Sequence, residues 1–304
     1  MRSPNFIIGG TSAGGTSFLS AVLIQHPEIY LPVKMRPEPH FFYKSWEYER
    51  GIDYYLSRWF PAVPDSAIAV GERSSSYLFG GEAVASRISA QYPNIKFIFT
   101  LRNPIERTWA NYRYTVLNGF EDQAFEDALR HESERIQKQT GIWAEIQPHN
   151  YTGRGFYARQ IRQFMNYFPL ENMMFIKSEY LSTQTEAELS KIYDFLKLSV
   201  KDSAYERSPD HTSVNVKNPK VQRDLRVYFG DKFDEVIEAT RKEESLEGFI
   251  STEKDEAKIN ELRSNLIDRK ISMSLSARSY LREVFHEDIN DLKNLIDFDV
   301  ADWQ

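Results

Sequence analysis

Short apolar runs that recur along the chain are the clearest pattern in this sequence. Three of them, at residues 5–8, 95–101 and 173–176, have the length and composition of buried strands. Apolar residues at helical spacing follow these runs, at residues 18–24, 104–114 and 186–196. Because strands and helices alternate in this way, we predict an α/β fold with a mostly parallel central sheet flanked by helices.

The stretch at about 202–270 has a different pattern. It is polar and charge-rich, shows helical periodicity at residues 221–240 and 256–269, and lacks clear strands. We expect it to be a helical insertion or cap in the C-terminal third of a single domain that spans residues 1–304. A closing helix is predicted at residues 276–296.

The composition limits what the chain can do. Of its 304 residues, 41% are hydrophobic and 27% are charged, which is ordinary for a globular protein with a large core. The net charge of -6 provides no general positive field for nucleic acid or an anionic membrane, so any anion must be held by a local site. The absence of cysteine excludes disulfides, thiolate metal sites and cysteine nucleophiles.

Targeting and membrane signals are not visible in the sequence. It has no basic leader followed by a long apolar stretch, and no window approaches the roughly 18 apolar residues that a membrane span needs. The lack of cysteine also fits a reducing compartment. We therefore expect a cytoplasmic protein without a membrane span.

A glycine-rich stretch, GGTSAGGTS at residues 9–17, joins the first predicted strand to the first predicted helix. Glycines there let backbone amides approach an anion closely, and the start of a helix favours negative charge. A nucleoside-triphosphate loop would need lysine before its final serine or threonine, but Gly15 or Thr16 stands there. An ATP-dependent small-molecule kinase is therefore the less favoured alternative, and a turn without a ligand is another.

Four segments, taken in their order along the chain, resemble one known family. They are the glycine loop, residues 36–42 (RPEPHFF), residues 71–77 (GERSSSY) and residues 101–112 (LRNPIERTWANY). They resemble the sulfotransferases of P-loop-like fold, especially the carbohydrate and bacterial branches, which use 3'-phosphoadenosine 5'-phosphosulfate (PAPS). The resemblance implies a P-loop-NTPase-like fold and in-line transfer of a sulfuryl group from PAPS to a hydroxyl, leaving PAP, without a metal ion.

The resemblance assigns the 5'-phosphosulfate to the loop residues Ser12, Ala13, Gly14, Gly15, Thr16 and Ser17. The family's loop reads G-x-x-K-G-G-T-T, and its lysine, which contacts the bridging and sulfuryl oxygens, falls on Ala13. Another cation would have to serve, and the candidates are Lys34, Arg36, Lys44 and Arg73. We favour Arg73, because it falls on the lysine of the family's GEKSPSYL segment. A surface ion pair with Glu72 is the alternative reading of Arg73.

The nucleotide's 3'-phosphate is assigned to the segment after the second predicted strand. Arg102 falls on the family's phosphate-binding arginine, at a strand end where open α/β sheets bind ligands. A guanidinium can hold a phosphate through two parallel hydrogen bonds. The family's serine for the same phosphate falls on Ala110, and Asn111 or Thr108 is a candidate substitute.

The acceptor's base is assigned through the segment RPEPHFF, which resembles the family's KEPHFF. Glu38 falls on the glutamate that takes the proton of the acceptor hydroxyl, and we expect His40 to orient the acceptor or share the proton. The chemistry needs such a carboxylate, because an alcohol becomes a better nucleophile as its proton leaves. Pro37 replaces the family lysine, so Arg36 would supply the local charge. A solvated turn residue is the alternative for Glu38, and a structural loop histidine for His40.

Two departures from the family pattern, at Ala13 and Ala110, leave a second function class open. It is a catalytically silent homologue that binds PAP, PAPS or a glycan without turnover. The partner that we expect is a glycan or small-molecule acceptor, and no nucleic acid. The sequence leaves the acceptor and the oligomeric state open.

Overall fold

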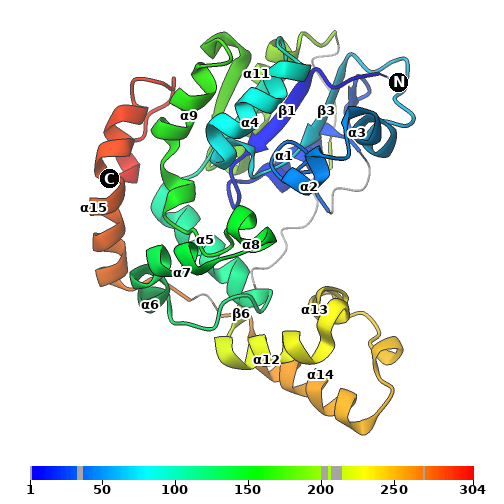
Figure 1. Ribbon diagram of the computed structural model, residues 1–304, viewed down its shortest axis with the longest axis vertical. Helices are drawn as coiled ribbons and strands as arrows, with labels where there is room; N and C mark the ends of the chain where they lie inside the picture. The colour runs from blue at the N-terminus through cyan, green and yellow to red at the C-terminus, as the bar shows by residue number, and fades with distance from the viewer. Residues whose placement is uncertain (1, 33–36, 200–204, 207–213, 270) are drawn as a thin grey trace. The chain divides into compact units, whose positions relative to one another are not determined.

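The computed structural model describes residues 2–32, 37–199, 205–206, 214–269 and 271–304. The chain divides into two compact units (Figure 1). The first comprises Met1–Arg107, Thr152–Pro209 and Arg282–Gln304, and the second comprises Thr108–Tyr151 and Asp210–Leu281. Our expectation of a single domain with an insertion stays a prediction.

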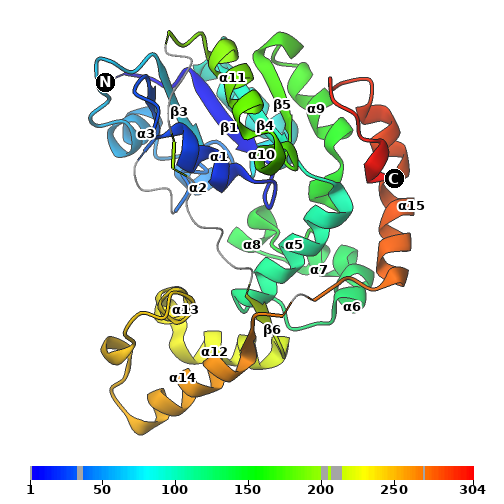
Figure 2. The same ribbon diagram turned by 180° about the vertical axis from the view of Figure 1, so that it is seen from behind.

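A five-stranded sheet forms the centre of the first unit. Its strands are β1 (Phe6–Gly10), β2 (Ile29–Tyr30), β3 (Ala69–Arg73), β4 (Lys96–Leu101) and β5 (Met173–Lys177). They lie in the order β2-β3-β1-β4-β5, and every neighbouring pair is parallel. Figures 1 and 2 show the sheet from opposite sides. Because the chain continues from the central β1 to strands on both sides of it, the carboxyl end of β1 is the place where such sheets bind ligands.

Helices cover both faces of this sheet. The helices of the first unit are α1 (Thr16–Leu23), α2 (Ser45–Tyr48), α3 (Ile52–Trp59), α4 (Tyr77–Gln91), α9 (Tyr157–Met165), α10 (Tyr180–Thr183) and α11 (Thr185–Leu196). On one face, α1 and α11 share a buried apolar cluster with β1, β4 and β5 (Figure 2). On the other face, Phe164 of α9 lies edge-on to the rings of Phe97 and Phe99, with 5.4 Å between ring centres. Two further helices, α5 (Pro104–Leu117) and α15 (Leu275–Leu292), contribute residues to both units.

The predicted fold class, a mostly parallel sheet flanked by helices, is confirmed. The three predicted strands correspond to β1, β4 and β5, which are apolar along almost their whole length because helices cover both of their faces. The sequence pattern did not predict β2 and β3. β3 has the sequence AVGER, and its Glu72 and Arg73 are buried, so it lacks the apolar run that identifies a covered strand.

The second unit is mainly helical. It contains α6 (Phe125–Arg130), α7 (Glu132–Lys138), α8 (Ile142–Ile146), α12 (Pro219–Phe229), α13 (Phe233–Arg241) and α14 (Glu253–Asn265). Apolar side chains from α12, α13 and α14 form a shared core, which includes Leu225, Phe233, Val236 and Leu262. The single helix expected at 221–240 is two helices, because Gly230 has φ +53° and ends α12.

The 202–270 stretch, in which the sequence shows no clear strand, contains two very short strands among the residues that the structure describes. β6 (Asn215–Val216) pairs antiparallel with β7 (Leu266–Ile267). Each strand has two residues, which is too short to produce a recognisable alternation in sequence. Among the helices of the described ranges, none combines the length and apolar character needed to cross a lipid bilayer.

The glycine loop after β1 is packed tightly against β4. A Cβ atom added at Gly14 would lie 2.5 Å from the Thr11 hydroxyl oxygen and 2.8 Å from the carbonyl oxygen of Thr100. The second contact is with backbone of β4, which cannot rotate away. Glycine at this position is therefore needed for close packing between the loop and the sheet.

The variant Gly14→Ala tests this packing. We expect it to lower the free energy of unfolding by about 1–3 kcal/mol, as overpacking does, measured from urea unfolding curves. Gly248→Ala is the matched control, because no atom lies within 4 Å of a Cβ added there. Equal midpoints for the two variants would contradict the tight fit.

Candidate active site

The loop between β1 and α1 is held at the carboxyl end of the sheet. The Thr11 amide donates to the Thr100 carbonyl at 2.8 Å, and the Thr100 hydroxyl donates to the Gly10 carbonyl at 3.0 Å. Ala13 and Gly15 have φ of +63° and +91°, and Gly15 is the N-cap of α1. Among the described residues, no side chain caps α1, and the amides in the first turn of a helix are donors that favour an anion.

Arg102, which follows β4, reaches this loop. Its guanidinium donates to the carbonyl of Ala13 at 3.2 Å, and its own carbonyl accepts from the Tyr157 hydroxyl at 2.9 Å. The structure therefore brings two of the predicted nucleotide-binding residues, Ala13 and Arg102, into contact.

Arg73 reaches the start of α1 from the neighbouring strand. It is the last residue of β3 and pairs in register with Ile8 of β1. Its guanidinium donates to the Ser17 hydroxyl and forms an ion pair with Glu38, with 3.3 Å between Nη1 and Oε1. The side chain is only 5% exposed, so Arg73 is not the surface partner of Glu72 that the alternative reading assumed.

Glu38 is held by donors on both of its oxygens. Its Oε2 accepts from the Ser75 amide at 2.7 Å and from the Ser75 hydroxyl at 2.8 Å, while Oε1 faces Arg73. His40 Nε2 lies 3.2 Å from the same Oε2. The carboxylate is 16% exposed, so the reading of Glu38 as a solvated turn residue is wrong. The three predicted catalytic residues, Glu38, His40 and Arg73, are brought together.

Burial keeps His40 neutral. It lowers the pKa of the imidazole from 6.5 to about 4, outweighing the attraction of Glu38, and Lys44, Arg154 and Arg73 add to the lowering. A neutral ring that carries its proton on Nε2 donates to Glu38, which assigns this tautomer. Within the described part of the chain, Nδ1 has no hydrogen-bond partner. His40 therefore orients the carboxylate rather than neutralising it.

Four further predicted site residues lie elsewhere in the chain. Lys34 and Arg36 lie outside the described residues, and Lys44 precedes α2 with its ammonium 5.8 Å from the centre of the Trp46 ring. Ala110 is half-buried on α5, in the second unit. Its place at the 3'-phosphate stays a prediction.

Two polar groups in or beside the site, Ser75 and Glu72, were not among the predicted site residues. Ser75, which binds Glu38, stood in the quoted GERSSSY segment, but only Arg73 was selected from it. Glu72 is fully buried, and burial raises the pKa of its carboxyl from 4.5 to about 7 although Ser74, Tyr77 and Tyr55 donate to it. Its position beside Arg73 suggested an ion pair, whereas neighbouring strand residues point to opposite faces.

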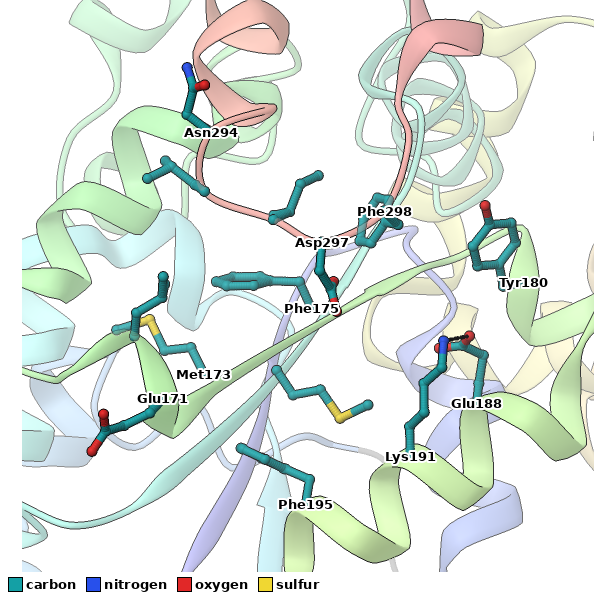
Figure 3. Close-up of a pocket in the computed structure, with 14 residues that line it drawn as sticks. Glu171, Met173, Phe175, Tyr180, Glu188, Lys191, Phe195, Asn294, Asp297 and Phe298 are labelled. Atoms are coloured by element: carbon teal, nitrogen blue, oxygen red, sulfur yellow. Dashed lines mark hydrogen bonds and ion pairs between the residues drawn. The ribbon is translucent and has the colours of Figure 1, made fainter.

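A separate pocket lies along the edge strand β5 (Figure 3). It has a volume of about 570 Å³ and is lined mainly by β5, α11 and residues 294–298, with Lys191 paired to Glu188 at its rim. It shares no lining residue with the candidate site at the ends of β1, β3 and β4. Among the described residues, no group of three or more His, Asp or Glu side chains is arranged to hold a metal ion.

Residues 3–269 match the family model described as "Sulfotransferase domain". The chain belongs to the sulfotransferase domain family. The family predicted from the four resembling segments of the sequence is thus confirmed.

Relatives and solved structures within this family can be compared directly. The chain is 32% identical over 202 residues to human "Heparan sulfate glucosamine 3-O-sulfotransferase 6", covering 65% of this chain and 53% of that protein. It is 27% identical over 199 residues to human "Bifunctional heparan sulfate N-deacetylase/N-sulfotransferase 2", covering 64% of this chain and 22% of that one. The chain thus spans about half, or less, of the length of these curated relatives. The crystal structure of a sulfotransferase from Alicyclobacillus acidocaldarius has the same fold, with a TM-score of 0.71 and 24% identity over 100% of this chain and 99% of that chain.

The buried carboxyl and imidazole give the sulfotransferase domain a pH-dependent stability. Between pH 4.5 and about 7, the folded protein holds a proton on Glu72 that the unfolded chain has released. The stabilising contribution of Glu72 to the free energy of unfolding is therefore full below pH 4.5 and is lost as pH rises through 7. His40 acts in the opposite sense, because its contribution is present above pH 6.5 and is lost as pH falls to about 4.

Because the two groups change the stability in opposite directions, removing Glu72 should make the pH dependence due to His40 visible. We expect the unfolding free energy of Glu72→Gln to rise with pH more steeply than that of wild type, by up to about 1.4 kcal/mol per pH unit between pH 4.5 and 7. Urea unfolding at a series of pH values measures the slope. Glu49→Gln, at an exposed position, is the control and should follow wild type. Parallel profiles for Glu72→Gln and wild type would show that Glu72 is ionised in the folded protein throughout this range.

Proposed function

We propose that this protein transfers a sulfuryl group from PAPS to a hydroxyl of a heparan-sulfate-type glycan, with Glu38 as the base. The observation that carries the proposal is the position of one guanidinium. Arg73 contacts the Ser17 hydroxyl at the start of α1 and the Glu38 carboxylate at the same time. A residue of the expected donor loop and the expected base thus meet at a single cation.

The residues of the loop fit the 5' end of the donor. The uncapped start of α1 and the left-handed turns at Ala13 and Gly15 present backbone amides, and Arg73 supplies positive charge where the family's lysine is missing. Arg102, beside the loop, would hold the 3'-phosphate. In this proposal Arg73 replaces the cation lost at Ala13.

The chemistry divides between these groups. When bound, PAPS supplies the sulfuryl group: the acceptor oxygen forms a bond to sulfur while the bond from sulfur to the bridging phosphate oxygen breaks, and PAP leaves with that electron pair. Glu38 takes the hydroxyl proton, His40 and Ser75 keep its carboxylate oriented, and Arg73 and the α1 amides stabilise the charge on the departing phosphate. Such electrostatic stabilisation is the main contribution expected for a loose, phosphoryl-like transition state.

The acceptor class is supported by the relatives and by local charge. Heparan sulfate appears in the names of both human relatives, and one of them is named for the 3-hydroxyl of glucosamine. Around His40, the cations Arg73, Lys44 and Arg154 act on the ring together with one anion, Glu38. A locally positive site of this kind suits an anionic glycan, although the net charge of the chain is -6.

Transfer from radiolabelled PAPS to heparan sulfate oligosaccharides tests the proposal. We expect turnover by wild type, a fall in kcat of about 10² to 10⁴ in Glu38→Gln, and unchanged PAP affinity, because the base acts on the acceptor. Glu49→Gln, an exposed glutamate, is the control.

Two other results of these measurements would count against the proposed transfer. A rise in melting temperature with PAP but no transfer to any acceptor would favour the silent homologue, which the alanines at positions 13 and 110 motivate. No change in melting temperature at saturating PAP would overturn the proposal.

The two arginines should separate binding from turnover. Arg102→Ala should weaken PAP binding by about 1.5–3 kcal/mol, the usual loss for a charged hydrogen bond, as measured by calorimetry. Arg73→Ala should mainly lower kcat, with partial recovery in Arg73→Lys, because lysine restores the charge but not the planar fork. Arg58→Ala, at an exposed position, is the control. A reversed pattern would exchange the two roles.

A further inference from the structure

The buried carboxylate of Glu72 lies beside the candidate site without taking part in it. Glu72 is fully buried on β3, directly before Arg73. Because consecutive strand residues point to opposite faces, Arg73 turns toward α1 while Glu72 turns toward α3 and α4. There it accepts from the hydroxyls of Ser74 at 2.7 Å, Tyr77 at 2.7 Å and Tyr55 at 3.1 Å.

Two of these hydroxyls also accept hydrogen bonds from the base-carrying segment, Glu38–Phe42. Ser74 Oγ accepts from the amide of His40 at 2.8 Å, and the Tyr77 oxygen accepts from the amide of Phe42 at 3.2 Å. A backbone amide can only donate, so each hydroxyl uses its single proton toward Glu72. One carboxylate thereby fixes the direction of two hydroxyl bonds to alternate amides of the same segment.

This segment needs such support. Residues 37–40 belong to no helix or strand, so neither a helix nor a sheet ladder fixes their amides. His40 has φ +47°, a left-handed conformation that is unfavourable for a residue with a Cβ. Glu38 lies two residues before this strained position, so a shift at His40 would move the carboxylate away from Arg73.

We propose that Glu72 is a positioning residue that holds the Glu38–Phe42 segment in place through the hydroxyls of Ser74 and Tyr77. The inference rests on the proposed function, because the segment matters for turnover only if Glu38 is the base. Glu72 touches no reacting atom in this scheme, and it acts through the backbone of His40 and Phe42 alone.

Tyr55 supplies a matched control within the same cluster. Its ring is fully buried, and its hydroxyl donates to the same Oε1 of Glu72 as Tyr77 does. Among the hydrogen bonds of the described residues, the Tyr55 hydroxyl makes this one and none to the base-carrying segment. Tyr55→Phe and Tyr77→Phe therefore delete the same group from the same carboxylate, but only the second removes a link to the segment.

The experiment compares Tyr77→Phe and Ser74→Ala with Tyr55→Phe in the full chain, at about pH 8. This pH is above the pKa of about 7 to which burial raises the Glu72 carboxyl, so the carboxylate is ionised. Amide hydrogen exchange, followed by NMR, should be about tenfold faster at Phe42 in Tyr77→Phe and at His40 in Ser74→Ala. Both amides should exchange at the wild-type rate in Tyr55→Phe. In the transfer assay, kcat should fall about tenfold in the two linked variants with PAP affinity unchanged, and Tyr55→Phe should keep wild-type kcat.

Three outcomes would overturn the inference. Unchanged exchange in both linked variants would show that the hydroxyls do not hold the segment, and faster exchange with unchanged kcat would show that holding it does not matter for turnover. Equal losses in Tyr55→Phe and Tyr77→Phe would reduce Glu72 to general packing. If wild type transfers nothing, the proposed function fails, whereas the exchange rates still decide whether Glu72 fixes the segment. The two links reach different amides of the segment, so either variant tests the inference if the other does not fold.

Discussion

The ion pair between Arg73 and Glu38 is the interaction on which the candidate site depends. Both side chains are largely buried, at 5% and 16% exposure, and a buried charge without its partner is strongly destabilising. Further hydrogen bonds help to stabilise the pair: Ser75 donates twice to Glu38, and Arg73 Nη1 donates to the Ser17 hydroxyl. The need to satisfy two buried charges therefore draws the start of α1, the end of β3 and the segment before α2 to one point.

Two carboxyl groups with different surroundings, those of Glu38 and Glu72, lie near the end of β3. Glu38 lies among donors and cations at the site, whereas Glu72 lies in the core, where burial raises the pKa of its carboxyl to about 7 and the charge of Glu38 adds to the rise. The alternation of a strand allows Arg73 to face one environment and Glu72 the other across a single peptide bond. Hydroxyl groups then connect the two, so the polar site is supported by a polar cluster inside the core.

Some of the strands and site residues could be predicted from the sequence, whereas β3 and the contacts within the site could not. β1, β4 and β5 could be predicted because strands covered on both faces are nearly continuous apolar runs. β3 could not be predicted, because two of its residues, Glu72 and Arg73, are charged and yet buried. Their hydrogen bonds and the ion pair with Glu38 make this burial possible, whereas charged residues in a sequence usually indicate an exposed position. Glu38, His40 and Arg73 were selected by family resemblance, but their contact depends on the order of parallel strands. The bond between Ser75 and Glu38 spans 37 positions, a distance at which local sequence carries no signal.

The missing lysine at Ala13 changes how charge can be handled during transfer. A lysine in the loop would be a point charge separate from the base, whereas the planar guanidinium of Arg73 can serve the loop and Glu38 together. Under the proposed mechanism, Glu38 loses its negative charge as it takes the acceptor's proton. The positive charge of Arg73 is then less compensated at the moment when negative charge grows on the departing phosphate. With the loop lysine absent and the cation on β3 retained, the proposed mechanism couples proton removal to stabilisation of the leaving group, because one guanidinium is shared between them.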